Sequence, residues 1–454
     1  MISKFSIPSL YDEIYTDRVE DFLLVYNPLS EKGISVLNKE AAFLFKLIDN
    51  KKTINNIFLL AKNKDRKVKI STIIKIFKEF LSSEIIYFNK PKDKEKLFKK
   101  PTHLGVWLHI TNQCNLRCKY CYVWKTPAKM SKEIGEKTVK KIILDAKKHN
   151  FKKITFKFGG GESLLEFSLV LYLIELIKKL AKKEKLEVDF VVLTNGVLLN
   201  EEIAKKLKKE GIRAAISLDG LGYYNDVQRV FPNGKGSFKY VEKGIENLKK
   251  AGVLFNVSVT ITSKNIENIP QLTKYLLERE IPFAFNFYRE NPFVKEKLEG
   301  DDKKLVEFLK KAYRIIAENP PRYSLINGLL DRVNFKKPHL YPCGMGNSYI
   351  VVRQDGKIVS CQMTLEKPIG SIYNSDLIET MRRGNFVQPK NLTVEGKTPC
   401  NKCQWRYVCG GGCPLLTFEQ KGKYTVNSPY CAVYKVLIPK VLRIEAKRLI
   451  KYGR

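Results

Sequence analysis

Residues 114–121 read Cys114-Asn-Leu-Arg-Cys118-Lys-Tyr-Cys121, a C-x3-C-x2-C run. Thiolates at this spacing converge on one metal centre, because a tight turn can direct all of them at a shared point. Three thiolates on a four-iron cluster leave one iron free to bind a substrate or a cofactor. A zinc site is the alternative, but zinc usually takes a fourth protein ligand, and no further Cys or His follows closely.

The cysteine run lies in a region where short apolar segments alternate with amphipathic ones. Alternation of this kind predicts an α/β fold with a parallel sheet and helices outside it. Six such units predict a partial TIM-like (βα)6 barrel, with the active site and the cysteine run at the C-terminal ends of the strands. The expected strands are 105–111, 153–158, 188–193, 214–218, 255–262 and 283–288, and the expected helices between them are 131–148, 167–183, 200–210, 238–251 and 269–280.

Three further motifs follow successive predicted strands. Gly159-Gly-Gly-Glu162 follows the second strand, and Thr194-Asn-Gly196 ends the third. Ile216-Ser-Leu-Asp-Gly220 ends the fourth strand, and Asn225-Asp-Val-Gln-Arg229 comes soon after it. In this order and together with the cysteine run, the motifs resemble those of the radical S-adenosylmethionine (radical SAM) enzymes over residues 104–288.

The resemblance implies a cofactor and a set of contacts to it. In that family the unligated iron of a 4Fe-4S cluster chelates S-adenosylmethionine (AdoMet), and one electron cleaves AdoMet to methionine and a 5′-deoxyadenosyl radical, which abstracts a substrate hydrogen atom. Glycines let the backbone approach the methionine moiety, a glutamate accepts from its ammonium group, a serine and an arginine contact the ribose or carboxylate region, and an aromatic residue neighbours the adenine. Tyr120 corresponds to that aromatic residue, and Phe285 in the sixth strand is a second candidate for the same pocket, with plain barrel core as the alternative. The implied residues are Tyr120, Gly160, Gly161, Glu162, Ser217, Arg229 and Phe285.

Seven cysteines near the C-terminus form a second pattern. A C-x12-G-x4-C arrangement is followed by C-x2-C-x5-C-x3-C and by one final cysteine. The pattern resembles the SPASM domain of radical SAM enzymes that modify peptides and proteins, which holds two auxiliary clusters. A zinc ribbon is the alternative. The resemblance implies three 4Fe-4S clusters, ligated by Cys114, Cys118 and Cys121, by Cys343, Cys361 and Cys413, and by Cys400, Cys403, Cys409 and Cys431.

Two positions depart from the patterns of these families. Some SPASM enzymes carry an eighth cysteine six residues after the first, where this chain has Tyr349, so the first auxiliary cluster has either an open iron or a ligand other than cysteine. In sulfatase-maturing enzymes a catalytic Asp follows the second SPASM cysteine. Here that residue is Gln362, which cannot act as a carboxylate base. The second departure argues against sulfatase maturation.

Within residues 1–92, the segments Phe22-Leu-Leu-Val-Tyr-Asn-Pro28 and Val36-Leu-Asn-Lys-Glu-Ala-Ala42 resemble the peptide-recognition domain of enzymes that mature ribosomal peptides. A predicted hairpin, 21–26 and 34–37, is followed by helical periodicity at 40–49, 54–63 and 71–82, which indicates a winged-helix-like module. Such a domain binds a leader peptide by strand addition and in a helix groove. A generic winged helix, either structural or nucleic-acid-binding, is the alternative. The expected domains are 1–92, a linker 93–103, the barrel 104–300, a bridging segment 301–341 and the SPASM region 342–454.

Composition narrows the class of protein further. The 454 residues carry a formal net charge of +35, but Lys is interleaved with Glu along nearly every predicted helix, which favours a solvated surface over a nucleic-acid partner. No apolar run is long enough to span a bilayer, and no secretion signal is evident. We therefore expect a cytoplasmic protein without a membrane partner, whose cysteines are reduced thiolates on metals.

These patterns predict a radical SAM oxidoreductase that modifies a ribosomally synthesised peptide, forming a thioether or another cross-link. A sulfatase-type maturase or a haem-precursor decarboxylase of the same superfamily is one alternative, and a zinc-ribbon nucleic-acid binder is another. The expected partners are a precursor peptide or protein and an external electron donor of the ferredoxin or flavodoxin type. The sequence assigns no catalytic acid or base.

Overall fold

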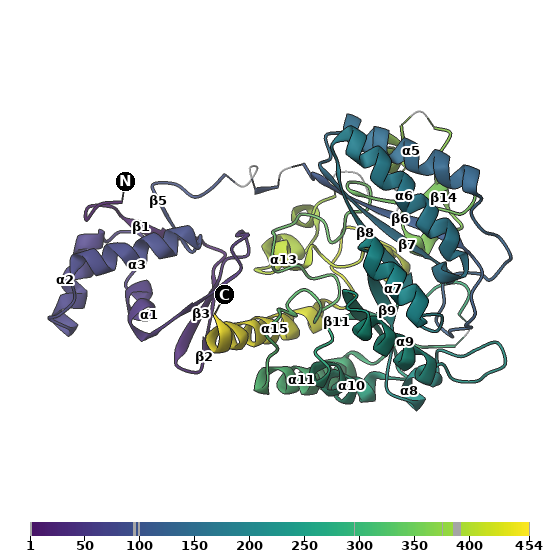
Figure 1. Ribbon diagram of the computed structural model, residues 1–454. Helices are drawn as coiled ribbons and strands as arrows, with labels where there is room; N and C mark the ends of the chain where they lie inside the picture. Colours follow the sequence, from purple (N-terminus) through teal and green to yellow (C-terminus); the bar gives the residue numbers. More distant parts are fainter. Residues whose placement is uncertain are drawn as a thin grey trace.

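The computed structural model describes residues 2–93, 97–98, 100–294, 296–374, 376–384 and 392–453. Its centre is a nine-stranded sheet in the order β11-β10-β9-β8-β7-β6-β12-β13-β14, with helices along its outer face (Figure 1). The expected α/β class and the partial barrel are confirmed. The expected linker 93–103 lies partly outside the described residues.

Six parallel strands form the barrel part of the sheet, and each expected strand is present within a few residues. Their alternation separates two faces: Phe156 and Phe158 are fully buried toward the helices, whereas Lys157 between them points to the other side. The strands are β6 (His103–Thr111), β7 (Lys153–Gly160), β8 (Glu187–Thr194), β9 (Arg213–Ser217), β10 (Phe255–Ile261) and β11 (Phe283–Phe287).

The outer helices begin where the sequence provides caps. The Ser131 side chain accepts from the N–H of Ile134 at the start of α5, and the Asn200 side chain accepts from the N–H of Ile203 at the start of α7. Gly211 ends α7 in the left-handed conformation, with φ of 69°. The helices are α5 (Lys132–Lys148), α6 (Phe167–Glu184), α7 (Glu201–Glu210), α9 (Phe238–Lys250), α10 (Ile269–Glu278) and α11 (Asp302–Glu318).

The C-terminal region joins the barrel sheet, which the sequence did not predict. Strand β12 (Tyr349–Val352) pairs in parallel with β6, and β13 (Lys357–Val359) and β14 (Pro368–Ser371) continue the sheet antiparallel. Tyr349 lies opposite Gly105 in this register, and a Cβ at Gly105 would come within 2.9 Å of the Tyr349 ring. The cysteine-rich region is therefore continuous with the first barrel strand.

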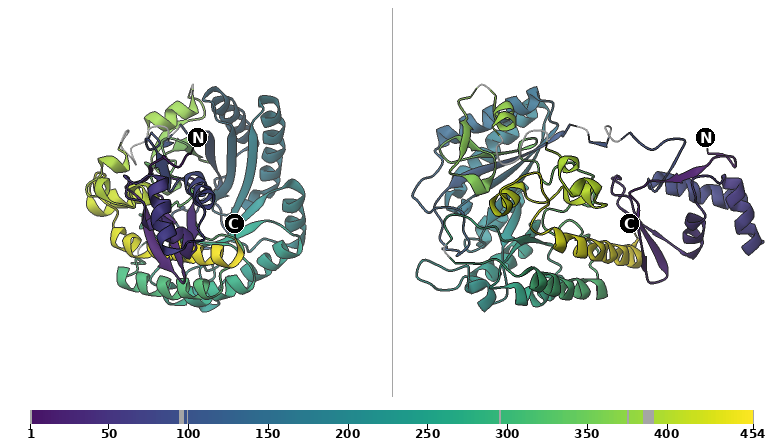
Figure 2. Two further views of the ribbon diagram at one scale, coloured as in Figure 1. Left: turned by 90° about the vertical axis from the view of Figure 1, so that its left-hand side faces the viewer. Right: turned by 180° about the vertical axis from the view of Figure 1, so that it is seen from behind.

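The N-terminal module has its own core and lies to one side of the barrel (Figures 1 and 2). An antiparallel sheet of β2 (Tyr15–Val19), β3 (Phe22–Tyr26) and β4 (Ile34–Leu37) meets the C-terminal helix α15 (Cys431–Tyr452), which also packs on α11. The three expected helices are present as α1 (Lys39–Lys46), α2 (Ile54–Lys64) and α3 (Ile70–Ser82), and a strand that was not expected, β1 (Pro8–Leu10), pairs with β5 (Ile86–Phe88).

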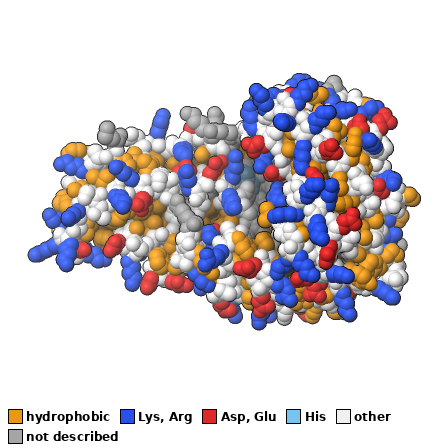
Figure 3. Space-filling view, in the orientation of Figure 1, with side chains coloured by type: hydrophobic (Ala, Val, Ile, Leu, Met, Phe, Trp, Pro, Cys, Tyr) orange, Lys and Arg blue, Asp and Glu red, His pale blue; other side chains and the backbone are white. Residues whose placement is uncertain are grey.

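The surface carries Lys and Arg over both the N-terminal module and the barrel, with Asp and Glu between them (Figure 3). On this face the basic residues are dispersed and do not gather into one patch, which agrees with the mixed charge pattern of the sequence. Among the described residues, no helix combines the length and the apolar character that a membrane crossing needs.

Candidate active site

The first cysteine run forms a loop beyond the end of β6, at the C-terminal edge of the sheet. The N–H of Arg117 donates to the carbonyl of Val230 at 2.6 Å, and the N–H of Lys119 donates to the carbonyl of Gln228 at 2.9 Å. These bonds fasten the loop to the segment that follows the fourth strand. The cysteine loop is therefore held at the edge where the strand ends converge.

The three thiols of this loop lie in one electrostatic environment. Burial raises the pKa of the Cys118 thiol to about 12, an effect that the Arg229 guanidinium opposes and that the neighbouring Cys121 and Cys114 reinforce. The Lys125 ammonium donates to Cys121 Sγ at 3.1 Å. Adjacent thiols supported by two cations suit a site that holds thiolates on a metal cluster.

The Gly-Gly-Glu motif closes against the cysteine loop. A Cβ at Gly160 would lie 2.4 Å from the carbonyl oxygen of Thr111, and one at Gly161 would lie 2.0 Å from that of Gln113. Backbone bonds cross the same gap, because the N–H of Gly161 donates to Thr111 at 2.7 Å. Glycine is required here by the close approach of two protein segments, a reason that the sequence alone did not supply.

The Glu162 side chain is engaged within the protein. Its carboxylate accepts from the N–H of Leu164 at 3.0 Å and from the N–H of Asn195 at 2.7 Å, and it is 1% exposed. Burial raises the pKa of this carboxyl group, and the hydrogen bonds oppose the shift. Asn195 also donates to Asn115 at 2.7 Å. Glu162 therefore joins the ends of β7 and β8 beneath the cysteine loop.

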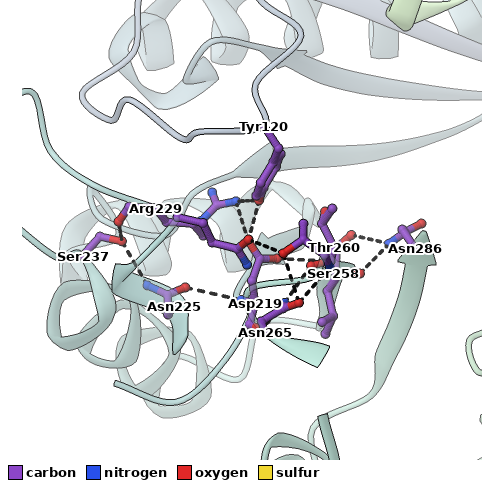
Figure 4. A network of polar contacts seen from close by, with 12 residues as sticks. Tyr120, Asp219, Asn225, Arg229, Ser237, Ser258, Thr260, Asn265 and Asn286 are labelled. Atoms are coloured by element: carbon purple, nitrogen blue, oxygen red, sulfur yellow. Dashed lines mark hydrogen bonds and ion pairs between the residues drawn. The ribbon is translucent and has the colours of Figure 1, made fainter. Parts of the chain in front are cut away.

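A buried polar network joins the cysteine loop to the fourth and fifth strands (Figure 4). The Tyr120 hydroxyl donates to Asp219 Oδ2 at 2.5 Å, and Arg229 donates to that hydroxyl and pairs with the same carboxylate at 3.4 Å. Asp219 is itself held by the N–H of Thr260 at 2.8 Å. The sequence indicated Tyr120 and Arg229, but it assigned no role to Asp219, because the pairing of Asp219 with Tyr120 spans about a hundred residues of chain.

A cavity of about 560 Å³ lies between the barrel strands and the C-terminal region. Its volume is in the range typical of small-molecule and cofactor sites. Tyr120, Ser217 and Arg229 line one side of it. On the other side are three cysteines from the C-terminal region, Cys343, Cys361 and Cys413. The fold thus brings three of the seven expected cofactor contacts and the three expected first auxiliary ligands to one cavity.

Phe285 is not among the residues that line this cavity. It is 2% exposed and packs on Phe283, with the ring centroids 5.2 Å apart. The neighbouring Asn286 faces the cavity and donates to Ser258 at 3.0 Å, because successive residues of a strand point to opposite faces. Phe285 packs in the core, and its role as a cofactor contact stays a prediction.

The remaining four cysteines line a separate cavity, together with Trp405 and Gly411. Beside this group lies Lys397, which is 1% exposed and whose Nζ has no hydrogen-bond partner among the described residues. Burial lowers the pKa of Lys397, and the neighbouring thiolates oppose that effect. Burying a cation without a partner costs free energy. A metal cluster held by cysteine thiolates carries negative charge, so a cluster at these four cysteines would stabilise the Lys397 ammonium. The four are Cys400, Cys403, Cys409 and Cys431.

Comparison with known proteins agrees with this geometry. The family model of the radical SAM superfamily matches residues 108–276. The chain is 31% identical over 265 residues to the GTP 3′,8-cyclase of Helicobacter pylori, covering 56% of this chain and 78% of that protein. The protein belongs to the radical SAM superfamily. It is thus an enzyme, and the radical SAM fold implies a 4Fe-4S cluster and AdoMet, which the cysteine loop and the cavity fit.

Two further matches extend beyond the barrel of this radical SAM enzyme. It is 28% identical over 348 residues to the cysteine-type anaerobic sulfatase-maturating enzyme of Clostridium perfringens, covering 71% of this chain and 91% of that protein. The solved structure of native anSMEcpe with bound AdoMet and Cp18Cys peptide matches with a TM-score of 0.60 at 25% identity, covering 77% of this chain and 99% of that chain. The radical SAM enzyme is therefore homologous to sulfatase maturases.

Proposed function

We propose that this radical SAM enzyme removes a hydrogen atom from a ribosomally made peptide or protein and forms a thioether or another cross-link in it. The observation that carries the proposal is the single cavity shared by Ser217, Arg229 and the cysteines of the C-terminal region. The peptide-bound structure of a homologous protein supports a substrate of this class. A substrate residue in the cavity would lie between the expected AdoMet contacts, Ser217 and Arg229, and the three cysteines expected to hold the first auxiliary cluster.

Bound together, the cluster and AdoMet would supply the one-electron chemistry that abstracts the hydrogen atom. In the proposal, the loop of Cys114, Cys118 and Cys121 holds that cluster, while Tyr120, Ser217, Arg229 and the backbone of residues 160–161 position AdoMet. Glu162 would support the site indirectly, because its hydrogen bonds hold the ends of β7 and β8 together beneath the cysteine loop. Tyr120 and Arg229 would bind as one unit, because Asp219 holds both. The other seven cysteines would hold two auxiliary clusters.

In the proposed thioether step, the peptide would lose one hydrogen atom, one proton and one electron. One hydrogen atom leaves the substrate carbon, one proton leaves the peptide thiol, and a carbon–sulfur bond forms between them. One electron remains, and Cys343, Cys361, Cys413 and the other four C-terminal cysteines would hold auxiliary clusters that could take it up and pass it to an external electron carrier. Tyr349 stands where an eighth cysteine would complete the first auxiliary site, which leaves an iron to which a substrate thiolate can bind.

We also propose that the N-terminal module, residues 1–92, recognises a leader peptide. Strand β4 is an edge strand of its three-stranded sheet, and edge strands accept an added strand. A groove of about 390 Å³ runs beside it, lined by Val36 of β4 and by Ile76 and Phe80 of α3. A leader peptide in this groove would tether the core peptide to the enzyme that contains the cavity.

The test combines the anaerobically reconstituted enzyme with AdoMet, a reductant and short peptides encoded beside its gene. We expect 5′-deoxyadenosine together with a peptide that has lost two hydrogen atoms for each cross-link, both read by mass spectrometry. Formation of 5′-deoxyadenosine without change to any such peptide contradicts the proposal.

Sulfatase-type maturation is the second candidate, and the homology to sulfatase-maturating enzymes favours it. The position that would carry the catalytic Asp holds Gln362, whose Oε1 accepts from the Tyr349 hydroxyl. A sulfatase-derived Cys peptide in the same assay separates the two candidates, because maturation converts its thiol carbon to a carbonyl without a cross-link.

A further inference from the structure

The wall of the central cavity has an excess of positive charge. Four cationic side chains line it, and no Asp or Glu is among the described lining residues. Two of the cations are paired from behind the wall: Arg229 with Asp219 at 3.4 Å, and Arg289 with Asp331 at 2.5 Å. The cations are Lys157, Arg229, Arg289 and Arg332.

Arg332 and Arg289 lie beside the same carboxylate, that of Asp331. Its Nε lies 3.8 Å from Asp331 Oδ1, while the other oxygen of that carboxylate is bound by Arg289. The Nε of Arg332 is buried and has no hydrogen-bond partner among the described residues. One carboxylate therefore lies between two guanidinium groups, and the pair keeps a net positive charge.

Among the described residues, Lys157 forms no ion pair or hydrogen bond. Its Nζ lies 5.8 Å from the centroid of the Tyr349 ring. It is partly buried on β7, opposite Trp107 of β6. Burial lowers the pKa of Lys157, and the nearby Arg332 lowers it further. An anion beside Lys157 would oppose both effects by favouring the charged ammonium form.

The three cysteines of this cavity interact with its arginines and not with Lys157. Arg332 is electrostatically coupled to Cys343 and Cys413, and Arg289 is coupled to Cys413, so these arginines balance thiolates. The charged neighbours that act on Lys157 are Arg332 and Arg213, with no cysteine among them. Lys157 belongs to barrel strand β7, and the cavity that it lines is the one in which the proposed function places the substrate.

We propose that Lys157 binds a carboxylate of the substrate in the central cavity. This inference rests on the proposed function and deepens it, because it assigns the substrate an acidic group close to the residue that is modified. The carboxylate comes either from an Asp or Glu side chain or from the C-terminus of the peptide. A charge-assisted hydrogen bond to a buried ammonium group is strong enough to select between a carboxylate and an amide.

Binding of labelled nonapeptides to the reconstituted, AdoMet-loaded full chain tests this directly. The probes are an Ala/Gly peptide amide with one central Glu, its Gln counterpart, and the Gln peptide with a free C-terminal carboxylate. We expect one carboxylate form to bind about tenfold more tightly than the Gln amide, as measured by fluorescence anisotropy. The preferred probe identifies the source of the carboxylate.

Three variants assign the preference to Lys157. We expect Lys157→Gln to remove the preference for the carboxylate peptide and Lys157→Arg to retain most of it. Lys152 is an exposed lysine just before the same strand, and Lys152→Gln should leave the preference unchanged. Equal binding of all three probes by the wild-type enzyme, or a preference that survives in Lys157→Gln, overturns the inference. Peptide binding requires no turnover, so failure of the proposed cross-linking reaction is observed separately, in the product assay.

Discussion

The Tyr349 hydroxyl donates a hydrogen bond to Gln362 Oε1 at 3.2 Å, on the wall of the central cavity. These are the two positions at which the sequence departs from the patterns it resembles. Gln362 follows Cys361 directly, and Tyr349 begins the strand that joins the C-terminal region to β6. The two departures therefore form one local arrangement beside the proposed first auxiliary site.

Tyr349→Cys tests whether an open iron at that site takes part in the reaction. An added thiolate would occupy the position proposed for the substrate thiolate, so we expect cross-linked product to fall by about tenfold while AdoMet cleavage continues. Tyr349→Phe, which keeps the ring against Gly105, is the matched control. Unchanged product formation in Tyr349→Cys, with an altered cluster spectrum, would argue against thiolate binding at this iron.

Gly161→Ala should disable the cofactor site. The new Cβ would lie 2.0 Å from the Gln113 carbonyl oxygen, so the cysteine loop must shift, at a cost of about 1–3 kcal/mol of folding free energy. AdoMet cleavage, followed as 5′-deoxyadenosine, should be lost. Gly211→Ala is the comparison, because its Cβ has nothing within 4 Å. It should cost about 1 kcal/mol and leave cleavage intact.

Asp219→Asn should leave the Arg229 guanidinium buried without its counter-charge. We expect the cluster-loaded protein to lose about 3–5 kcal/mol of stability in anaerobic urea unfolding, together with AdoMet affinity. The exposed pair Arg383–Glu379 offers a control, since Glu379→Gln should cost less than about 1 kcal/mol. A small loss in Asp219→Asn would mean that Arg229 finds another partner.

Iron analysis distinguishes a protein with three 4Fe-4S clusters from a zinc-ribbon protein. The reconstituted wild-type enzyme should hold about twelve irons, and a variant with Ala at Cys114, Cys118 and Cys121 should hold about eight. The remaining clusters should still absorb light in the visible region. A colourless protein that retains zinc would contradict the proposed auxiliary clusters.

Acid should destabilise the fold through His109. Burial lowers the pKa of His109 to about 4, and the side chain is fully buried with Nε2 2.7 Å from Asn112 Oδ1. The unfolded chain, with a histidine pKa of about 6.5, binds the extra proton first, so stability falls as the pH falls from about 6.5 toward 4, by up to about 3 kcal/mol. Unfolding free energies of the wild type and His109→Gln at several pH values should show a weaker pH dependence in the variant.

Much of the architecture follows from local patterns. Six strands and their helices were predicted within a few residues, because hydrophobic periodicity and caps such as Ser131 act over short distances along the chain. The cysteine spacing likewise indicated a metal loop at the strand ends, since all of its ligands lie within one turn. For Phe285 the local pattern could not separate a cavity contact from barrel core, because which face of β11 turns inward depends on tertiary packing.

Only the tertiary structure decided which distant residues meet. The parallel pairing of β12 with β6 puts Tyr349 beside Gly105 and near Lys157, and Arg332 comes to the same cavity from a loop between domains. Such contacts depend on register and packing between segments separated by a hundred residues or more, which no local pattern encodes. The sequence by itself indicated the superfamily and predicted the grouping of its cysteines, whereas the charge of the cavity, on which the proposed substrate carboxylate rests, arises only in the folded chain.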